Sequence, residues 1–190
     1  NLYFYGNGVE RDYKKAFDYF KASVDEGRYN ELSSMYMIGQ IYEEGLGVEQ
    51  NYEQALYWYK QAAGDAYEEF YEECRNANLQ IIEKPGDYFA QNKLGDIYWD
   101  GEIVSEDYKE AFKWYQKAAD QGYYASQFNL GWMYEHGQYV ESDTKQAFYW
   151  YKKSADQDFS SAQYKTACMY ASGEGVIKNE KLADLWFERA

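Results

Sequence analysis

Proline, cysteine and histidine are scarce in this sequence. Its 190 residues include one proline, two cysteines and one histidine. A single proline beside 21% aromatic residues fits packed helices, and it does not fit a disordered chain. Cys74 and Cys168 lack a second cysteine at metal-ligand spacing, and His136 has no evident co-ligand. We therefore expect no disulfide framework, no metal site and no cofactor.

Positive charge and long apolar runs are also scarce. The chain has 19 Lys and Arg against 33 Asp and Glu, a formal net charge of −14. Such a chain repels phosphate, so we expect neither nucleic acid nor anionic lipid as a partner, whereas a basic or neutral protein is suitable. No apolar run approaches the ~20 residues of a membrane span, and no leader is visible. We expect a soluble protein without membrane insertion; cytoplasm, bacterial periplasm and secretion remain open.

The sequence does contain internal repeats. The segments GDIYWDGEIVSEDYKEAFKWYQKAADQG and GWMYEHGQYVESDTKQAFYWYKKSADQD begin at Gly95 and Gly131, 36 residues apart. Further copies continue from Gly39 and from Ala167, and a truncated copy opens the chain. The step from Gly39 to Gly95 is 56 residues, which indicates an insertion.

Each copy predicts two helices. Apolar residues recur at three- and four-residue steps in the first helix, and a glycine follows it. These glycines are Gly45, Gly101, Gly137 and Gly173. An Asp or Asn suited to capping the second helix stands four residues before a repeated alanine. These cap residues are Asp12, Asn51, Asp107, Asp143 and Asn179. Three residues beyond the alanine lies a tryptophan that we expect in the spine of the fold: Trp58, Trp114, Trp150 and Trp186.

The helix pairs predict an all-α solenoid, because a pair buries its apolar face only by stacking on its neighbours. We expect residues 1–190 to form one domain that is built from consecutive repeats. It consists of a partial repeat 1–31, a repeat 32–67, a helical insertion 68–87 and repeats 88–123, 124–159 and 160–190. The first copy lacks the start of its first helix and the last copy ends inside its second, so we expect a fragment of a longer array.

The segment LGDIYWDGEIVSEDYKEAFKWYQKAADQG, from Leu94 to Gly122, resembles the Sel-one-like repeat (SLR) family, a relative of the tetratricopeptide repeats. NLGWMYEHG from Asn129 and QAFYWYKKSA from Gln146 follow the same motif. The resemblance implies a right-handed α/α superhelical solenoid of antiparallel helix pairs, used as an adaptor that holds other proteins. Some bacterial members carry a cysteine pair in every repeat and are associated with β-lactam binding. This sequence lacks that cysteine pattern.

In helix-pair solenoids the first helices line the concave face, and there the residues vary between copies. We expect a partner to contact Phe4, Gln40, Glu43, Glu44, Asp96, Trp99, Asp100, Trp132, Glu135 and His136. Trp99 and Trp132 are the strongest candidates, because exposed aromatic rings are typical binding hot spots. The alternative is that both rings pack between repeats. The carboxylates among these residues favour a basic segment of the partner.

The sequence contains no recognisable pair of catalytic nucleophile and general base. None of its glycine-containing loops has the spacing of a phosphate-binding loop. We therefore predict a non-catalytic protein- or peptide-binding scaffold. The alternative is an acidic inhibitor or immunity-type protein that caps a basic toxin or enzyme. A β-lactam-interacting enzyme of the cysteine-rich kind is a third and less favoured hypothesis. The identity of the partner and the oligomeric state stay open.

Overall fold

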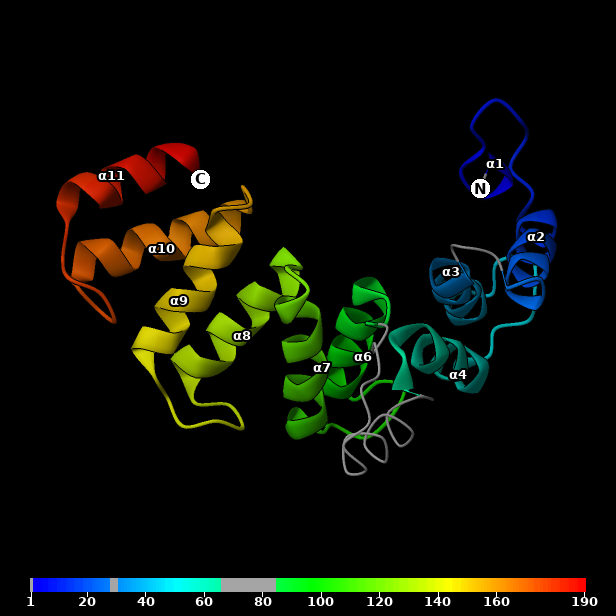
Figure 1. The fold of residues 1–190 in the computed structure, drawn as a ribbon, viewed down its shortest axis with the longest axis horizontal. Coiled ribbons are helices and arrows are strands. Elements are labelled where there is room, and N and C mark those ends of the chain that lie inside the picture. The colour runs from blue at the N-terminus through cyan, green and yellow to red at the C-terminus, as the bar shows by residue number, and fades with distance from the viewer. Residues whose placement is uncertain (1, 28–30, 66–84) are drawn as a thin grey trace, which may run out of the picture. The chain divides into compact units, whose positions relative to one another are not determined.

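The computed structural model describes residues 2–27, 31–65 and 85–190 (Figure 1). In these residues the regular structure consists of ten helices and no strand, which confirms the predicted all-α class. The chain forms two compact units, Asn1–Leu94 and Gly95–Ala190. Most of the expected insertion 68–87 lies outside the described residues. Within the part that the structure describes, no helix is long and apolar enough to cross a membrane.

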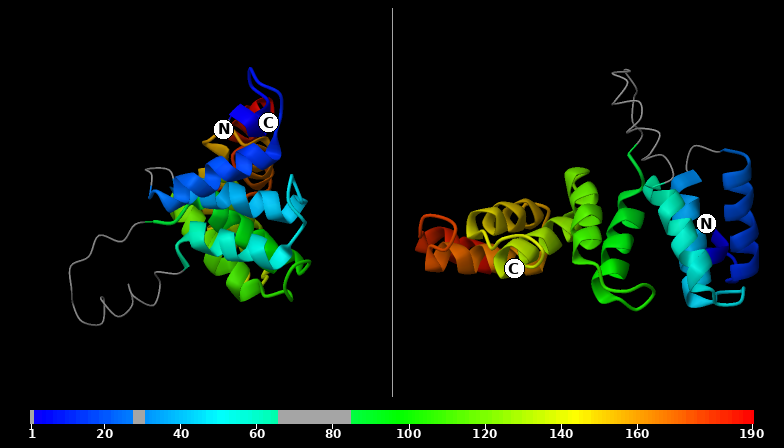
Figure 2. Two further views of the ribbon diagram at one scale, coloured as in Figure 1. Left: turned by 90° about the vertical axis from the view of Figure 1, so that its right-hand side faces the viewer. Right: turned by 90° about the horizontal axis from the view of Figure 1, so that it is seen from below.

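Consecutive helices pack against one another within each unit. The first unit contains α1 (Leu2–Tyr5), α2 (Tyr13–Asp25), α3 (Glu31–Glu44), α4 (Tyr52–Ala63) and the start of α6 (Tyr88–Asp100). The second unit contains the end of α6 with α7 (Tyr108–Asp120), α8 (Tyr124–His136), α9 (Thr144–Ala155), α10 (Ser160–Ser172) and α11 (Glu180–Arg189). Figure 2 shows α2, α3 and α4 side by side, and Figure 1 shows the same for the pairs α8 with α9 and α10 with α11. We call α3, α6, α8 and α10 the first helices, and α4, α7, α9 and α11 the second helices.

The predicted helix boundaries are confirmed. All five cap residues accept a backbone N–H bond at the start of their helix; Asp143, for example, accepts from Lys145 and Gln146. A cap of this kind contributes about 0.5–2 kcal/mol. Gly137 ends α8 in the left-handed region, with φ of 68°, where a side chain would be strained. The loop is closed by the backbone N–H of Asp143, which donates to the carbonyl oxygen of Tyr134 at 3.0 Å.

The repeated tryptophans lie in the core of the second unit, as predicted. Trp114, Trp150 and Trp186 are 1%, 6% and 5% exposed, whereas Trp58 in the first unit is half-buried. A cation lies over each ring: Lys117 is 4.5 Å from the Trp114 centroid, and Lys21 is 4.5 Å from that of Trp58. Such contacts contribute about 0.5–2 kcal/mol, so part of the scarce positive charge stabilises the spine.

A second repeated contact was not predicted. The tyrosine that follows the tryptophan in three copies is buried, and its ring lies flat against the glycine of the preceding first helix. These pairs are Tyr59 with Gly39, Tyr115 with Gly95 and Tyr151 with Gly131. A methyl group on Gly131 would lie 2.6 Å from Cδ1 of Tyr151, so the ring occupies the space that a side chain would need. The glycine therefore permits a helix–ring contact.

Candidate functional site

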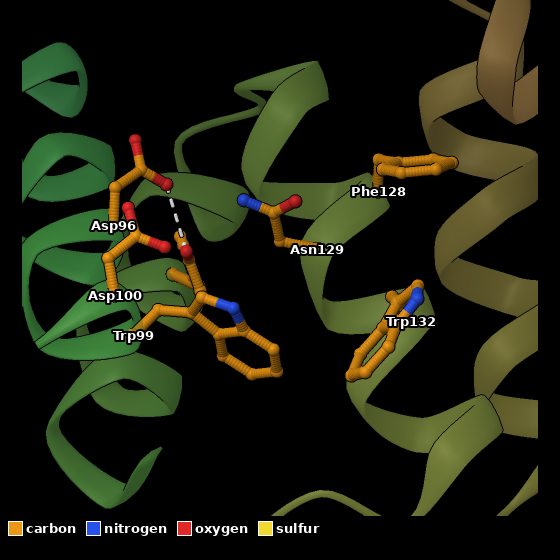
Figure 3. A pocket seen from close by; sticks show the side chains of 7 residues that line it. Asp96, Trp99, Asp100, Phe128, Asn129 and Trp132 are labelled. Atoms are coloured by element: carbon orange, nitrogen blue, oxygen red, sulfur yellow. Dashed lines mark hydrogen bonds between the residues drawn. The ribbon is translucent and has the colours of Figure 1, made fainter. Parts of the chain in front are cut away.

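A pocket lies on the facing sides of α6 and α8 in the second unit (Figure 3). Its volume is about 300 Å³. It is lined by Asp96, Trp99 and Asp100 of α6, by Phe128, Asn129 and Trp132 of α8, and by Tyr115 of α7. Four of the ten residues predicted to contact a partner are thereby brought together: Asp96, Trp99, Asp100 and Trp132.

The aromatic part of the pocket is built around the two tryptophans. The rings of Trp99 and Trp132 meet edge to face, with centroids 5.1 Å apart and planes at 89°. Trp132 also stacks on His136 at 3.9 Å, and Trp99 packs edge to face on Tyr108 at 5.0 Å. Both tryptophans are half-buried and pack against the core. They thus contact the neighbouring repeat, as the alternative interpretation expected, while one part of each ring lines the pocket.

The polar part of the pocket consists of two carboxylates, an amide and a hydroxyl. The Tyr115 hydroxyl donates to Oδ1 of Asp96 at 2.8 Å, the bond drawn dashed in Figure 3. Burial, the charges of Asp96 and Asp100, and this hydrogen bond raise the pKa of Tyr115 above its ordinary value, while Asn129 bonds to the same hydroxyl. The hydroxyl therefore stays protonated at neutral pH and orients the Asp96 carboxylate. The Asp100 side chain is exposed at the mouth.

In two other copies the corresponding tyrosine takes part in a cluster with a glutamate and a lysine. In the second unit, Tyr151 donates to Oε2 of Glu135 at 2.5 Å, and Nζ of Lys165 lies 2.8 Å from the same oxygen. In the first unit, Tyr59 donates to Glu43 at 2.6 Å, and Lys93 reaches Glu43 at 2.7 Å. Glu43 and Glu135, which we expected to attract a basic partner, each already hold a lysine of the chain.

The remaining predicted residues do not line the pocket. Phe4 belongs to α1 and packs on Tyr13 and Phe20 with centroids 5.5 and 6.2 Å apart. Gln40 is half-buried and Glu44 exposed, both on α3 of the first unit. His136 is exposed at the end of α8, where its Nδ1 lies 2.9 Å from the carbonyl oxygen of Trp132.

Sequence reasoning missed Tyr115, Phe128 and Asn129 as pocket residues. A signal was present for Asn129. The corresponding residues of the neighbouring copies are Lys93 and Lys165, so the change to asparagine marks this copy as different.

The Glu135 cluster should make stability depend on pH. Burial acts to raise the pKa of Glu135, but hydrogen bonds from Lys165 and Tyr151 outweigh it, and the pKa lies below its ordinary value of 4.5. A lowered pKa means that the stabilisation is present above pH ~4.5 and is lost as the pH falls through the folded-state pKa. We expect Glu135→Gln to remove about 0.2–1 kcal/mol of stability at pH 7 and to flatten the acid limb of the stability profile.

Urea unfolding from pH 7 to pH 3 measures this dependence. Glu141→Gln, at an exposed carboxylate in the loop after α8, is the matched control and should keep the parent profile. Identical acid limbs for the parent and Glu135→Gln would show that the cluster does not stabilise the fold.

Among the described residues, no group of three or more His, Cys, Asp and Glu side chains is placed to hold a metal ion. The chemistry that the pocket does offer is the binding of a positively charged or aromatic group between tryptophan rings and carboxylates.

Comparisons with known proteins point to a single family. The Sel1 repeat profile matches residues 1–27, 32–64, 89–123, 125–159 and 160–190. The crystal structure of a Sel1 repeat protein from Oxalobacter formigenes is 28% identical with a TM-score of 0.81, over 99% of this chain and 67% of that one. The protective antigen c5321 of uropathogenic Escherichia coli, which displays an SLR fold, is 30% identical with a TM-score of 0.56. That match covers 99% of this chain but only 43% of the antigen.

A more distant similarity extends to an immunity protein, Pa5087 of Pseudomonas aeruginosa. It is 20% identical with a TM-score of 0.44, over 95% of this chain and 74% of that one, which is too remote to say anything about function. A search of curated protein sequences gave no significant match. The family that the repeats resemble is thus the one that the profile and the solved structures identify.

Proposed function

Since the chain belongs to the Sel1 repeat family, we propose that it is a non-catalytic scaffold that binds a protein or peptide on the faces of its first helices. Sel1 repeat proteins typically mediate protein–protein interactions. The observation that carries the proposal is the pocket between α6 and α8, where two half-buried tryptophans meet two carboxylates.

The contrast between constant and variable repeat positions supports this function. The capping residues and the spine tryptophans recur from copy to copy and are used for folding. The pocket side chains Asp96, Trp99 and Trp132 occupy positions that change from copy to copy, so they are free to specify a partner. Partly buried tryptophans are rigid and lose little conformational entropy on binding, which makes them suitable anchors.

The net charge of −14 supports a second candidate function, an acidic inhibitor that caps a basic toxin or enzyme. The two functions differ in their response to salt. A partner held by long-range charge attraction should dissociate as ionic strength rises, whereas one anchored by rings in the pocket should be retained in part.

Selection of a random peptide library on the immobilised chain tests the scaffold function. We expect the parent to enrich particular peptides, and Trp132→Ala to bind them at least tenfold more weakly because one wall of the pocket is lost. Tyr149→Ala is the matched control, since this tyrosine is 47% exposed on the second helix α9. It should bind like the parent. Circular dichroism checks that both variants are folded.

Failure to enrich any peptide, or equal binding by the parent and a folded Trp132→Ala, would contradict the proposal. If Trp132→Ala does not fold, Asp100→Asn replaces it. The Asp100 side chain is exposed, so its substitution leaves the packing of α6 intact.

A further inference from the structure

A second pocket lies against α10 and α11 and has a volume of about 580 Å³. It is lined by Phe128 of α8, by Ser160, Ser161, Tyr164 and Lys165 of α10, and by Phe187 and Ala190 of α11. The rings of Tyr164 and Phe187 meet edge to face, with centroids 5.7 Å apart. They are 57% and 42% exposed, so this face of the second unit presents a pair of aromatic rings to the outside.

The preceding copy contains the equivalent ring pair, and there another segment packs on it. Its two rings, 36 residues earlier in the sequence, are Phe128 and Tyr151, with centroids 5.3 Å apart. A third ring, that of Phe159, packs edge to face on Phe128, also at 5.3 Å. Tyr151 is fully buried. The face of α10 and α11 therefore repeats a surface on which the chain itself stacks the next copy.

The segment that covers the preceding pair has a defined structure. Phe159 is the N-cap residue of α10, and its side chain makes no capping hydrogen bond. Tyr123, at the equivalent position one copy earlier, is the N-cap residue of α8 and makes none either. Because Ser, Thr, Asp and Asn are the preferred capping residues, a ring at this position indicates a role in packing. The helix that follows Phe159 then packs against α9 (Figure 1).

The last copy also differs from the preceding one in two residues around this surface. Ala167 occupies the position of Gly131, where the equivalent ring of Tyr151 leaves no room for a methyl group. Ser160 occupies the position of Tyr124, whose ring packs on Phe159 at 5.1 Å. Serine is much smaller than tyrosine, so the pocket leaves more room for an incoming ring than the equivalent site of the preceding copy.

We propose that this second pocket binds a partner protein through a segment that enters a helix with a phenylalanine at its N-cap. The partner's ring would pack on Tyr164 and Phe187 as Phe159 packs in the preceding copy, and its helix would pack against α11 as α10 packs against α9. The inference goes beyond the proposed scaffold function, because it does not depend on the pocket between α6 and α8.

Charge favours a different protein over a second copy of this chain as the occupant. Two copies would each carry a net charge of −14, which opposes their association. Among the described residues, those that line the second pocket include one cation, Lys165, and no Asp or Glu. Nζ of Lys165 lies 2.8 Å from Oε2 of Glu135, so its charge is already compensated. Binding should therefore depend on apolar contact and persist at 0.5 M salt.

Nuclear magnetic resonance of the ¹⁵N-labelled chain tests the inference with two acetylated, amidated peptides. The first has the sequence of residues 156–172, which contains Phe159 and α10, and the second carries Phe159→Ala. We expect the first peptide to shift the backbone amide signals of Ser160, Ser161 and Lys165. It should bind at least about fivefold more tightly than the second, because the ring is the anchor.

Two variants of the chain locate the binding. Tyr164→Ala removes an exposed wall of the second pocket and should weaken binding of the first peptide at least about fivefold. Ser161→Trp fills the pocket from an exposed position and should weaken binding at least as much. Tyr149→Ala, which removes an exposed ring of α9, is the matched control and should leave binding unchanged. Circular dichroism checks that each variant is folded.

Three results would overturn the inference: no shift of the three amide signals, equal binding of the two peptides, or undiminished binding by the folded variants Tyr164→Ala and Ser161→Trp. Self-association of the parent chain that Phe187→Ser abolishes, measured by sedimentation velocity, would assign the face to a second copy and overturn the choice of partner. None of these results bears on the library selection, which is read out through Trp132→Ala. The two proposals can therefore fail separately.

Discussion

Substitution of Gly131 by alanine should destabilise the chain by about 1–3 kcal/mol, the usual cost of overfilling a packed site. The new methyl group would lie 2.6 Å from Cδ1 of Tyr151, closer than such atoms approach in real structures. The ring cannot easily move, because it is fully buried and its hydroxyl is held by Glu135 at 2.5 Å. Alanine is otherwise the better helix former by about 1 kcal/mol, so the expected sign is opposite to the ordinary one.

Denaturant unfolding of a double-mutant cycle separates the ring contact from helix propensity. In a Tyr151→Leu background the flexible leucine can move away from the new methyl group, so Gly131→Ala should cost at least about 1 kcal/mol less than in the parent. A parent in which Gly131→Ala is neutral or stabilising would show that Tyr151 does not pack closely on α8.

The last copy also indicates that the buried ring requires a glycine in the first helix. There the glycine position holds Ala167, and the position of the buried tyrosine holds Phe187, which is 42% exposed. A side chain on the first helix and a ring pressed against it are therefore alternatives. Both repeat positions, the small residue of the first helix and the aromatic residue of the second, can be recognised in the sequence. The contact between these two positions could not be predicted from it. Which residues meet across a helix pair depends on the angle at which the helices cross, and local periodicity does not determine that angle.

Helix boundaries could be predicted because they depend on neighbouring residues alone. Asp143 caps α9 through its own side chain, and Gly137 ends α8 through its own backbone, so a short segment contains the full cause. The spine position of Trp114 followed from the repeat, since a large ring that recurs beside a small residue is typical of a core.

The candidate site could be predicted only in part. Trp99 and Trp132 were placed on one face by repeat spacing, and the structure brings them into contact. Glu135 was placed there by the same argument, but Lys165 of the following copy pairs with it. That pairing depends on how far one first helix is shifted along the next, so spacing within a copy could not reveal it.

Replacement of Trp114 by alanine should have the largest effect on stability, a loss of about 3–5 kcal/mol. The side chain is 1% exposed in α7, so its removal leaves a cavity that the rigid helix pairs fill only partly. The loss includes the cation contacts of Lys113 and Lys117, which lie 5.0 and 4.5 Å from the ring centroid. Urea unfolding followed by circular dichroism measures the change.

Trp114→Phe and Tyr149→Ala show what the ring contributes. Phenylalanine keeps most of the volume and removes the indole N–H, which is buried with no hydrogen-bond acceptor among the described residues. Its loss should therefore be well below that of alanine. Tyr149 is 47% exposed on α9, and its truncation should change stability by only about 0.5 kcal/mol. If Trp114→Ala costs no more than Tyr149→Ala, the repeated tryptophan does not hold the helix pairs together, and its recurrence needs a functional explanation instead.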